Sequence, residues 1–426
     1  MDRSITHGIL LINLIVAVIF YLRRKNEVPF FIALFNMIVE YRIVALDSGV
    51  STFITYNYGI DFKFNMEYAY IASDLILLGS CIMLYCFIIF HRPAEKTIKD
   101  NNEMLKTFVT KSKTQIILGL CFFSAVSIVL GGRNDAGSYS LLIKIANSSF
   151  IIMLYLIIFF SKTKALLIKL TYGGVFLFLG YLTYSNSIRF QFLAWIIPIG
   201  YFIVRNVKPG RKIILSIVGL FFILIVFSLA GASRGTDIGG LTTQQKYEVG
   251  MQRIVAADDV NFIDGFMMIY QVYPKLLDYD YGIEHLAVFF RPIPRSWWPG
   301  KPLASWVRNY QAKYTGKVLE SAGFSPTIWG VFYSEGGTFG VVIFSVFWAW
   351  MLNYLYRKFS AFNSDLSVIL VGILLVSLIP VFRSGDLAGD LAIVLMSFWP
   401  IMLFVKYYKK FIKAELRKER LKQLVV

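Results

Sequence analysis

Long apolar stretches separated by short polar connections run through most of the chain. A helix that spans a bilayer needs about 20 mostly apolar residues. Stretches of roughly this length recur eleven times along the sequence. They cover residues 5–22, 28–46, 69–90, 114–131, 138–160, 165–182, 189–204, 212–231, 337–356, 366–382 and 387–405. The pattern predicts an all-α fold, a polytopic membrane helix bundle with about 11 transmembrane helices.

Basic residues are distributed unevenly among the connections between these stretches. Every second connection, together with the tail after residue 405, holds 25 of the 43 Lys and Arg residues, whereas the alternate short connections hold almost none. Lys and Arg concentrate on the cytoplasmic side of membrane proteins. The alternation therefore predicts a periplasmic N-terminus and a cytoplasmic C-terminus, with the first apolar stretch retained as a helix rather than cleaved as a signal peptide.

One connection on the predicted outer side is much longer than the others. The predicted organisation is eight transmembrane helices in 1–231, a periplasmic loop in 232–336, three transmembrane helices in 337–405 and a basic cytoplasmic tail in 406–426. Within the loop, apolar residues at helical spacing in 244–272 predict two short amphipathic helices on the bundle or at the membrane interface. A solvated cap is the alternative interpretation.

The composition supports the membrane interpretation and removes several other classes. The chain is 57% hydrophobic and only 16% charged, whereas soluble proteins are nearer a quarter charged. Its net charge of +17 would suggest nucleic acid in a soluble protein, but the topology accounts for most of it, so no nucleic-acid partner is expected. The three cysteines fall inside apolar runs, and neither a metal-ligand spacing nor a phosphate-binding loop is present. No metal and no cofactor are predicted.

Arginines at the predicted outer ends of helices run against the positive-inside bias, so they call for an explanation. These are Arg42, Arg189, Arg234 and Arg383. A guanidinium fork matches phosphate oxygens and keeps its charge at physiological pH. Converging at one depth, these side chains would bind a pyrophosphate. The alternative for each is snorkelling to the interface or pairing with a neighbouring acid.

The second half of the outer loop carries the densest chemical signal, in residues 289–302. Four prolines there favour an extended, rigid track. Trp297 and Trp298 offer flat apolar faces that stack on sugar rings, and three cations lie beside them. These cations are Arg291 and Arg295, candidates to bind the pyrophosphate with the four arginines above, and Lys301, a candidate to bind sugar with the two tryptophans. A proline-rich collar with interfacial Trp anchors is the alternative.

Candidates for a general base follow in the region that leads into the ninth apolar stretch. Gly, Ser and Thr in 323–340 permit a broken or re-entrant helix, and Glu335 is the best-placed acid within it. A salt bridge to one of the arginines is the other interpretation of Glu335. Asp386 and Asp390 open the last stretch and are runner-up candidates for the base or helix-dipole partners. His285 is a further candidate, although a single histidine in a loop is usually a surface residue.

At three places the chain resembles the bacterial O-antigen and capsule repeat-unit polymerases of the Wzy type. The first is Ser187-Ile188-Arg189. The second runs from Arg291-Pro292-Ile293-Pro294-Arg295 to Trp298-Pro299-Gly300-Lys301-Pro302, and it is the most specific. The third runs from Ser325-Pro326-Thr327 to Gly340, where Val331 stands at the family's usual Glu position and Glu335 follows four residues later. The general plan of about a dozen helices with one long outer loop is also similar.

The resemblance implies an enzyme, a metal-independent inverting glycosyltransferase of GT-C-like fold in the bacterial inner membrane. Donor and acceptor would be undecaprenyl-pyrophosphate-linked oligosaccharides, joined at the outer face into O-antigen or a related surface polysaccharide. The outward arginines would neutralise the pyrophosphate leaving group. Glu335, Asp386 or His285 would be the base, and a chain-length-regulating co-polymerase would be the partner.

Three other functions remain open at the level of sequence. An O-antigen ligase shares the architecture and donor but transfers the glycan to the lipid A core. A lipid-linked oligosaccharide flippase or other transporter would place charged residues at helix midplanes, whereas the unusual charges here lie at the outer ends. A non-catalytic assembly subunit is the third alternative.

Overall fold

The structure of the protein is a computed structural model that describes most of the chain. The described residues are 2–51, 62–92, 96–131, 138–160, 173–175, 189–205, 207–208, 211, 214–215, 244–245, 248, 252, 260–291, 293, 297–302, 305–314 and 325–425, without the side chains of 127–131, 138–145, 189, 422 and 424–425. The chain folds into two compact units. Unit 1 comprises Met1–Pro93, Ser228–Leu355 and Leu378–Ala392, and unit 2 comprises Ala94–Phe227, Tyr356–Ser377 and Ile393–Val426.

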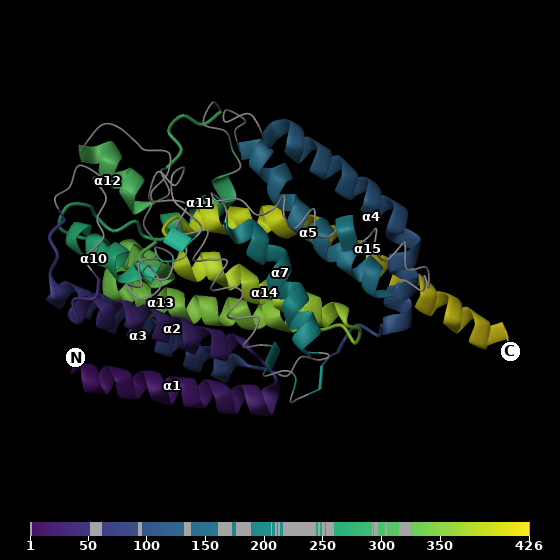
Figure 1. Cartoon of the computed structure of the whole chain (residues 1–426), viewed down its shortest axis with the longest axis horizontal. Coiled ribbons are helices and arrows are strands. Elements are labelled where there is room, and N and C mark those ends of the chain that lie inside the picture. The colour runs from purple at the N-terminus through teal and green to yellow at the C-terminus, as the bar shows by residue number, and fades with distance from the viewer. Residues whose placement is uncertain are drawn as a thin grey trace. The chain divides into compact units, whose positions relative to one another are not determined.

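The described part of the chain is all-helical (Figure 1). Its helices are α1 (Arg3–Arg24), α2 (Val28–Asp47), α3 (Met66–Phe90), α4 (Asn102–Gly131), α5 (Ser138–Phe160), α7 (Arg189–Arg205), α10 (Phe262–Val272), α11 (Ile283–Phe290), α12 (Trp306–Tyr314), α13 (Thr327–Phe359), α14 (Leu366–Arg383) and α15 (Leu387–Val425). An isolated β-bridge joins Ile98 to Phe362, and no strand occurs among the described residues.

Six of these helices are long and apolar enough to cross a membrane, namely α1, α2, α3, α13, α14 and α15. This confirms the prediction of a helical membrane protein. Helices α4, α5 and α7 coincide with three further predicted stretches. The stretches at 165–182 and 212–231 lie almost wholly outside the described residues, so the count of eleven and the GT-C-like fold stay predictions.

Helix ends differ from the predicted boundaries at two basic segments. Helix α4 begins at Asn102, within the polar connection predicted to run to residue 113. Helix α15 continues through the basic tail to Val425 instead of ending near residue 405. Hydrophobic runs mark the part of a helix that is in lipid, and Lys, Arg and Glu are good helix formers that extend it into water.

In unit 1, α1, α2 and α3 pack side by side, and α10 packs against α2 and α3 (Figure 1). The ring of Phe35 on α2 stacks on Phe262 at the start of α10, with centroids 5.4 Å apart. On α3, a methyl group added at Gly79 would lie 2.2 Å from the Trp329 ring. A glycine at this position therefore allows α13 to approach α3 closely.

Helix α10 lies within the loop segment predicted to form amphipathic helices, but it is buried on almost every side. Its aspartate, Asp264, is fully buried and forms an ion pair with Arg42 on α2, which is also fully buried. The helical spacing of the apolar residues was sufficient to predict the helix. The spacing did not indicate that its polar side would also be covered, because that depends on a partner more than 200 residues away.

Helix α13 consists of two helical segments that meet at Gly336 and Gly337. Gly337 has φ 62° and ψ −148°, a conformation that is essentially restricted to glycine. The loop before α11 donates hydrogen bonds to the carbonyls at the end of the first segment. The N–H groups of Asp280 and Tyr281 donate to the carbonyls of Ser334 and Glu335, at 2.9 and 3.0 Å. The helix break that the Gly-rich sequence permits is present, directly after Glu335.

In unit 2, α4 packs against α5, and α5 against α7. The turn between α13 and α14 is fixed by Asp100, which lies before α4. Its carboxylate accepts hydrogen bonds from the N–H groups of Asn363 and Ser364 at 2.7 and 3.3 Å, and from the Tyr408 hydroxyl at 3.0 Å. These contacts join three segments that are distant in the sequence.

Candidate functional site: a carboxylate cluster at the break in α13

Five acidic side chains from three segments of unit 1 lie within electrostatic reach of one another around α11. They are Asp280, Glu284, Glu335, Asp386 and Asp390, defined here as the carboxylate cluster. The loop before α11 and α11 itself supply the first two. Glu335 ends the first segment of α13, and the last two lie at the start of α15. The cluster therefore forms where the break in α13, helix α11 and the start of α15 meet.

Arg291 is the cation at the end of α11 and binds Asp386. Its Nη1 donates to both carboxylate oxygens, at 2.7 and 2.9 Å. Both side chains are partly exposed, at 32% and 24%. Asp386 also accepts the Gly389 N–H at 2.8 Å, so it caps α15 as the predicted helix-dipole partner would. A methyl group at Gly389 would lie within 2.9 Å of both Arg291 and Asp386.

Glu335 is fully buried and faces His285 on α11. Its Oε1 accepts the backbone N–H of His285 at 3.1 Å. Its Oε2 lies 2.6 Å from the imidazole Nδ1, but these two atoms do not form a hydrogen bond. The imidazole stacks on the ring of Phe344, with centroids 4.1 Å apart, and also packs against Phe332. Two predicted bases, Glu335 and His285, are thus brought together; Glu335 is fully enclosed, and the His285 side chain is 15% exposed.

Among the acids of the cluster that lie outside the apolar helices, Asp280 and Glu284 have pKa values that the environment raises. Burial raises the pKa of Asp280 to about 6, and the charge of Glu335 acts in the same direction. Hydrogen bonds from the Tyr273 hydroxyl at 2.8 Å and the Asn309 amide at 3.2 Å oppose the shift. A carboxyl group with this pKa changes its protonation state close to neutral pH, as a general acid or base should.

Glu284 is more deeply buried. Burial raises its pKa well above the usual range, and the charges of Asp386, Asp280 and Glu335 reinforce this effect. Its Oε1 accepts the backbone N–H of Ser305, while Oε2 has no hydrogen-bond partner among the described residues. Glu284 therefore holds a proton under conditions in which an exposed glutamate has lost it.

The six arginines predicted to bind pyrophosphate have different positions. Arg291 and Arg383 both lie within electrostatic reach of Asp390, so the structure brings these two together. Arg42 is fully buried and bound to Asp264 by two hydrogen bonds of 2.8 and 2.9 Å, which is the acid-pairing alternative. Arg189 begins α7, but its side chain lies outside the described residues, as do Arg234 and Arg295.

The three residues predicted to bind sugar lie just after α11. Trp297 is 81% exposed, and Trp298 is less exposed and contacts the edge of Phe290. Lys301 donates to the carbonyls of Ile293 and Arg291, at 2.8 and 3.3 Å. Lys301 therefore fixes the turn after α11, whereas both tryptophans are exposed.

Several residues of this site were not identified from the sequence. Asp280 and Glu284 were missed because an acid in a polar loop is usually solvated. Trp348 on α13 was also missed; its indole N–H donates to Nε2 of His285 at 3.0 Å. The adjacent Glu284-His285 pair at the start of an apolar helix was the available signal, since an acid there is either a cap or buried.

The cluster is not arranged as a metal site, because no group of three or more His, Cys, Asp or Glu residues in the described part of the chain has that geometry. No protein-family model, curated protein or solved structure matches the chain. The function must therefore be inferred from these residues and their chemistry.

Proposed function

We propose that the protein is a membrane glycosyltransferase that polymerises undecaprenyl-pyrophosphate-linked oligosaccharide repeat units at the outer face of the bacterial inner membrane. One observation carries the proposal. Asp280, a carboxyl group with a pKa of about 6, lies in the same cluster as Arg291, a partly exposed arginine paired with the partly exposed Asp386. A base tuned to neutral pH and an anion-binding guanidinium are the two groups that transfer from a pyrophosphate donor requires.

Asp280 is the base in this proposal. It takes the proton from the acceptor hydroxyl as that oxygen forms a bond to the anomeric carbon of the donor. The bond from this carbon to the pyrophosphate oxygen breaks on the opposite face, so the configuration inverts and lipid pyrophosphate leaves with the electron pair. Arg291 exchanges Asp386 for the pyrophosphate and neutralises the charge that develops on it.

Glu335 and His285 hold α11 against the break in α13 and are positioning residues in this proposal. Both oxygens of Glu335 face His285, and the side chain is fully buried. Asp386 is likewise engaged, by Arg291 and by the Gly389 N–H. Of the acids in the cluster that lie outside the apolar helices, Asp280 combines partial exposure with a pKa near neutrality, which favours it over the bases inferred from sequence.

The test is chain extension in proteoliposomes that contain only the purified protein and undecaprenyl-pyrophosphate-linked repeat units, without nucleotide or other protein. Wild type should give a ladder of longer products, and Asp280→Asn should give single units. Asp278→Asn, an exposed aspartate of the same loop, is the matched control and should extend normally. A wild-type protein that leaves the units unextended would contradict the proposal. Adding a chain-length-regulating co-polymerase should narrow the range of product lengths.

In cells, polymerase and ligase give different phenotypes. Loss of a polymerase leaves single repeat units on the surface lipid. Loss of a ligase leaves polymer on the carrier and none on the lipid A core.

A specific observation also favours transport of a lipid-linked oligosaccharide. The carboxylate cluster contains more acids than arginines among the described residues, and it lies beside a broken helix. Ionisable groups beside interrupted membrane helices are typical of proton-coupled transporters. Proton-driven translocation of a labelled lipid-linked oligosaccharide, without chain extension and abolished by Asp280→Asn, would support this alternative over the polymerase.

A further inference from the structure

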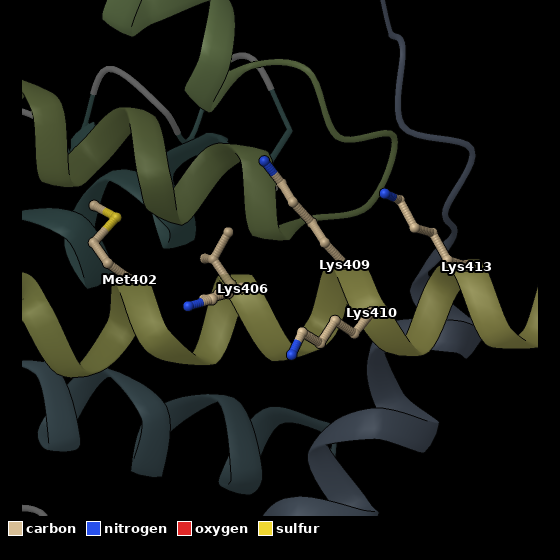
Figure 2. Close-up of a pocket in the computed structure, with 6 residues that line it drawn as sticks. Met402, Lys406, Lys409, Lys410 and Lys413 are labelled. Carbon is tan, nitrogen blue, oxygen red and sulfur yellow. The ribbon is translucent and has the colours of Figure 1, made fainter.

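Four lysines of α15 line an open pocket of about 360 Å³ in unit 2, together with Met402 and Val405 (Figure 2). They are Lys406, Lys409, Lys410 and Lys413, defined here as the lysine face. Their spacing of three, four and seven residues places them on one side of the helix. In Figure 2 the side chains of Lys409 and Lys413 extend from the same side of α15.

The lysine face begins where the apolar part of α15 ends. Residues 387–405 are predominantly apolar, and the next eight residues contain all four lysines. A helix rises 1.5 Å per residue, so this face lies within about two turns of the end of the hydrocarbon. Phospholipid headgroups occupy this depth. Met402 and Val405 add an apolar wall on the side of the pocket toward the hydrocarbon.

The positive charge of this face is not neutralised within the described part of the protein. None of the four lysines forms an ion pair with a described carboxylate; the ion pair of this helix region, Lys418 with Glu415, lies farther along. Asp100, which approaches α15 through Tyr408, already accepts two backbone N–H groups as well as the Tyr408 hydroxyl.

Aromatic rings hold two of the lysines in place. The Lys409 ammonium lies 5.4 Å from the centroid of the Phe362 ring, and that of Lys410 lies 5.7 Å from the centroid of the Tyr407 ring. Phe362 is itself fixed, because its carbonyl accepts a hydrogen bond from Lys96. Such contacts restrict the side chains while leaving ammonium protons for an additional acceptor.

We propose that the lysine face binds the headgroup of an anionic phospholipid, through its phosphodiester, at the membrane surface where α15 leaves the bilayer. The ammonium groups contact phosphate oxygens, and the first acyl carbons lie against Met402 and Val405. Basic clusters next to a membrane helix attract anionic lipid by about fivefold in affinity for each lysine. The inference does not depend on the reaction proposed for unit 1, because its measured quantity is lipid association.

The experiment measures association of nitroxide-labelled phosphatidylglycerol and phosphatidylcholine with the purified full-length protein by electron paramagnetic resonance. Wild type should prefer phosphatidylglycerol. A variant with Lys406, Lys409, Lys410 and Lys413 all changed to Gln should lose that preference. The matched control changes Arg417, Lys418, Arg420 and Lys422 to Gln, which removes the same charge from the same helix beyond the pocket, and it should keep the preference.

Two further measurements separate the possible outcomes. Single variants Lys409→Gln and Lys413→Gln, each of which leaves the helix almost unchanged, should each weaken the preference by about fivefold. Inorganic phosphate at constant ionic strength should not displace the labelled lipid, and displacement would assign the site to free phosphate. Equal loss in the control variant, or no preference in wild type, would overturn the proposal.

Discussion

The indole N–H of Trp348 donates a hydrogen bond to Nε2 of His285 at 3.0 Å. Because an indole nitrogen only donates, Nε2 must carry a lone pair, and a neutral imidazole then has its proton on Nδ1. Nδ1 lies 2.6 Å from Oε2 of Glu335. While Trp348 is bound, Nε2 of His285 is engaged as a hydrogen-bond acceptor and is not free to act as a base.

Replacing Trp348 with Phe should remove the preference of His285 for the tautomer protonated on Nδ1. The ring still fills its space, but the donor to Nε2 is lost, so a second tautomer becomes accessible. Nitrogen-15 NMR of histidine-labelled protein should show the Nδ1–H form in wild type and a mixture in Trp348→Phe. Trp350→Phe is the control, because Trp350 is exposed on the same helix. A wild-type Nε2–H tautomer would contradict the structure.

The sequence was sufficient to predict most helices and the break at Gly336, because a run of apolar residues specifies a membrane helix locally and adjacent glycines interrupt one. It was not sufficient for partners distant along the chain. Arg42 and Asp264 are 222 residues apart, and nothing near either one indicates the other. The burial of Glu284 has the same cause, since the segments that cover it belong to different parts of the chain.

The ion pair between Arg42 and Asp264 should be a structural element of unit 1. Removing one member leaves a buried charge, so Arg42→Ala or Asp264→Ala should lower the free energy of unfolding by about 3–5 kcal/mol. The double variant Arg42→Met, Asp264→Leu should be within about 1 kcal/mol of wild type, because no charge is left unpaired.

Denaturation in mild detergent measures this difference. Lys106→Ala, which breaks an exposed pair with Glu103, should change stability by less than about 0.5 kcal/mol. A double variant that is stable but inactive would show that Arg42 has a role in substrate binding.

The two adjacent glycines at the break in α13 should respond differently to substitution by alanine. At Gly337, φ of 62° and the Tyr279 hydroxyl 2.7 Å from an added methyl group both oppose a side chain, so Gly337→Ala should cost about 1–3 kcal/mol. At Gly336 the backbone is extended and no atom lies within 4 Å of an added methyl group. Gly336→Ala should therefore be tolerated. Thermal unfolding of the two variants compares their stabilities directly. Equal losses of stability would contradict the backbone conformation described for the two glycines.

The contact between Arg291 and Asp386 should control binding of the anionic donor. Arg291→Lys should reduce extension by about ten- to a hundredfold, because hydrogen bonds from a guanidinium to a charged oxygen are lost. Gly389→Ala, which forces both side chains to move, should raise KM for the lipid-linked donor without altering the charge. Arg357→Lys and Gly200→Ala are the controls, since Arg357 is exposed and Gly200 has no neighbour within 4 Å of an added methyl group. Unchanged kinetics in Arg291→Lys would exclude Arg291 from donor binding.

Asp280 should make the stability of the protein fall as pH rises. The pKa is about 6 in the folded protein and 3.8 in an exposed aspartate. Below both values each state holds the proton, and between them only the folded state does. The stabilising contribution of Asp280 is therefore fully present below about pH 4, decreases as the pH rises and is lost above about pH 6. In Asp280→Asn the side chain is neutral throughout, so this decrease should be absent from its thermal unfolding profile.

The same group should give the opposite trend in activity. A general base acts in its ionised form, so the rate of chain extension should rise with pH through a midpoint of about 6, where half of the Asp280 carboxyl groups have lost their proton. Asp280→Glu should retain a rise with a displaced midpoint, and Asp280→Asn should remove it along with most of the activity. Tyr273→Phe removes a hydrogen bond that favours the ionised form, so it should move the midpoint to higher pH. A midpoint that stays at the wild-type value in Tyr273→Phe would assign the pH dependence to a different group.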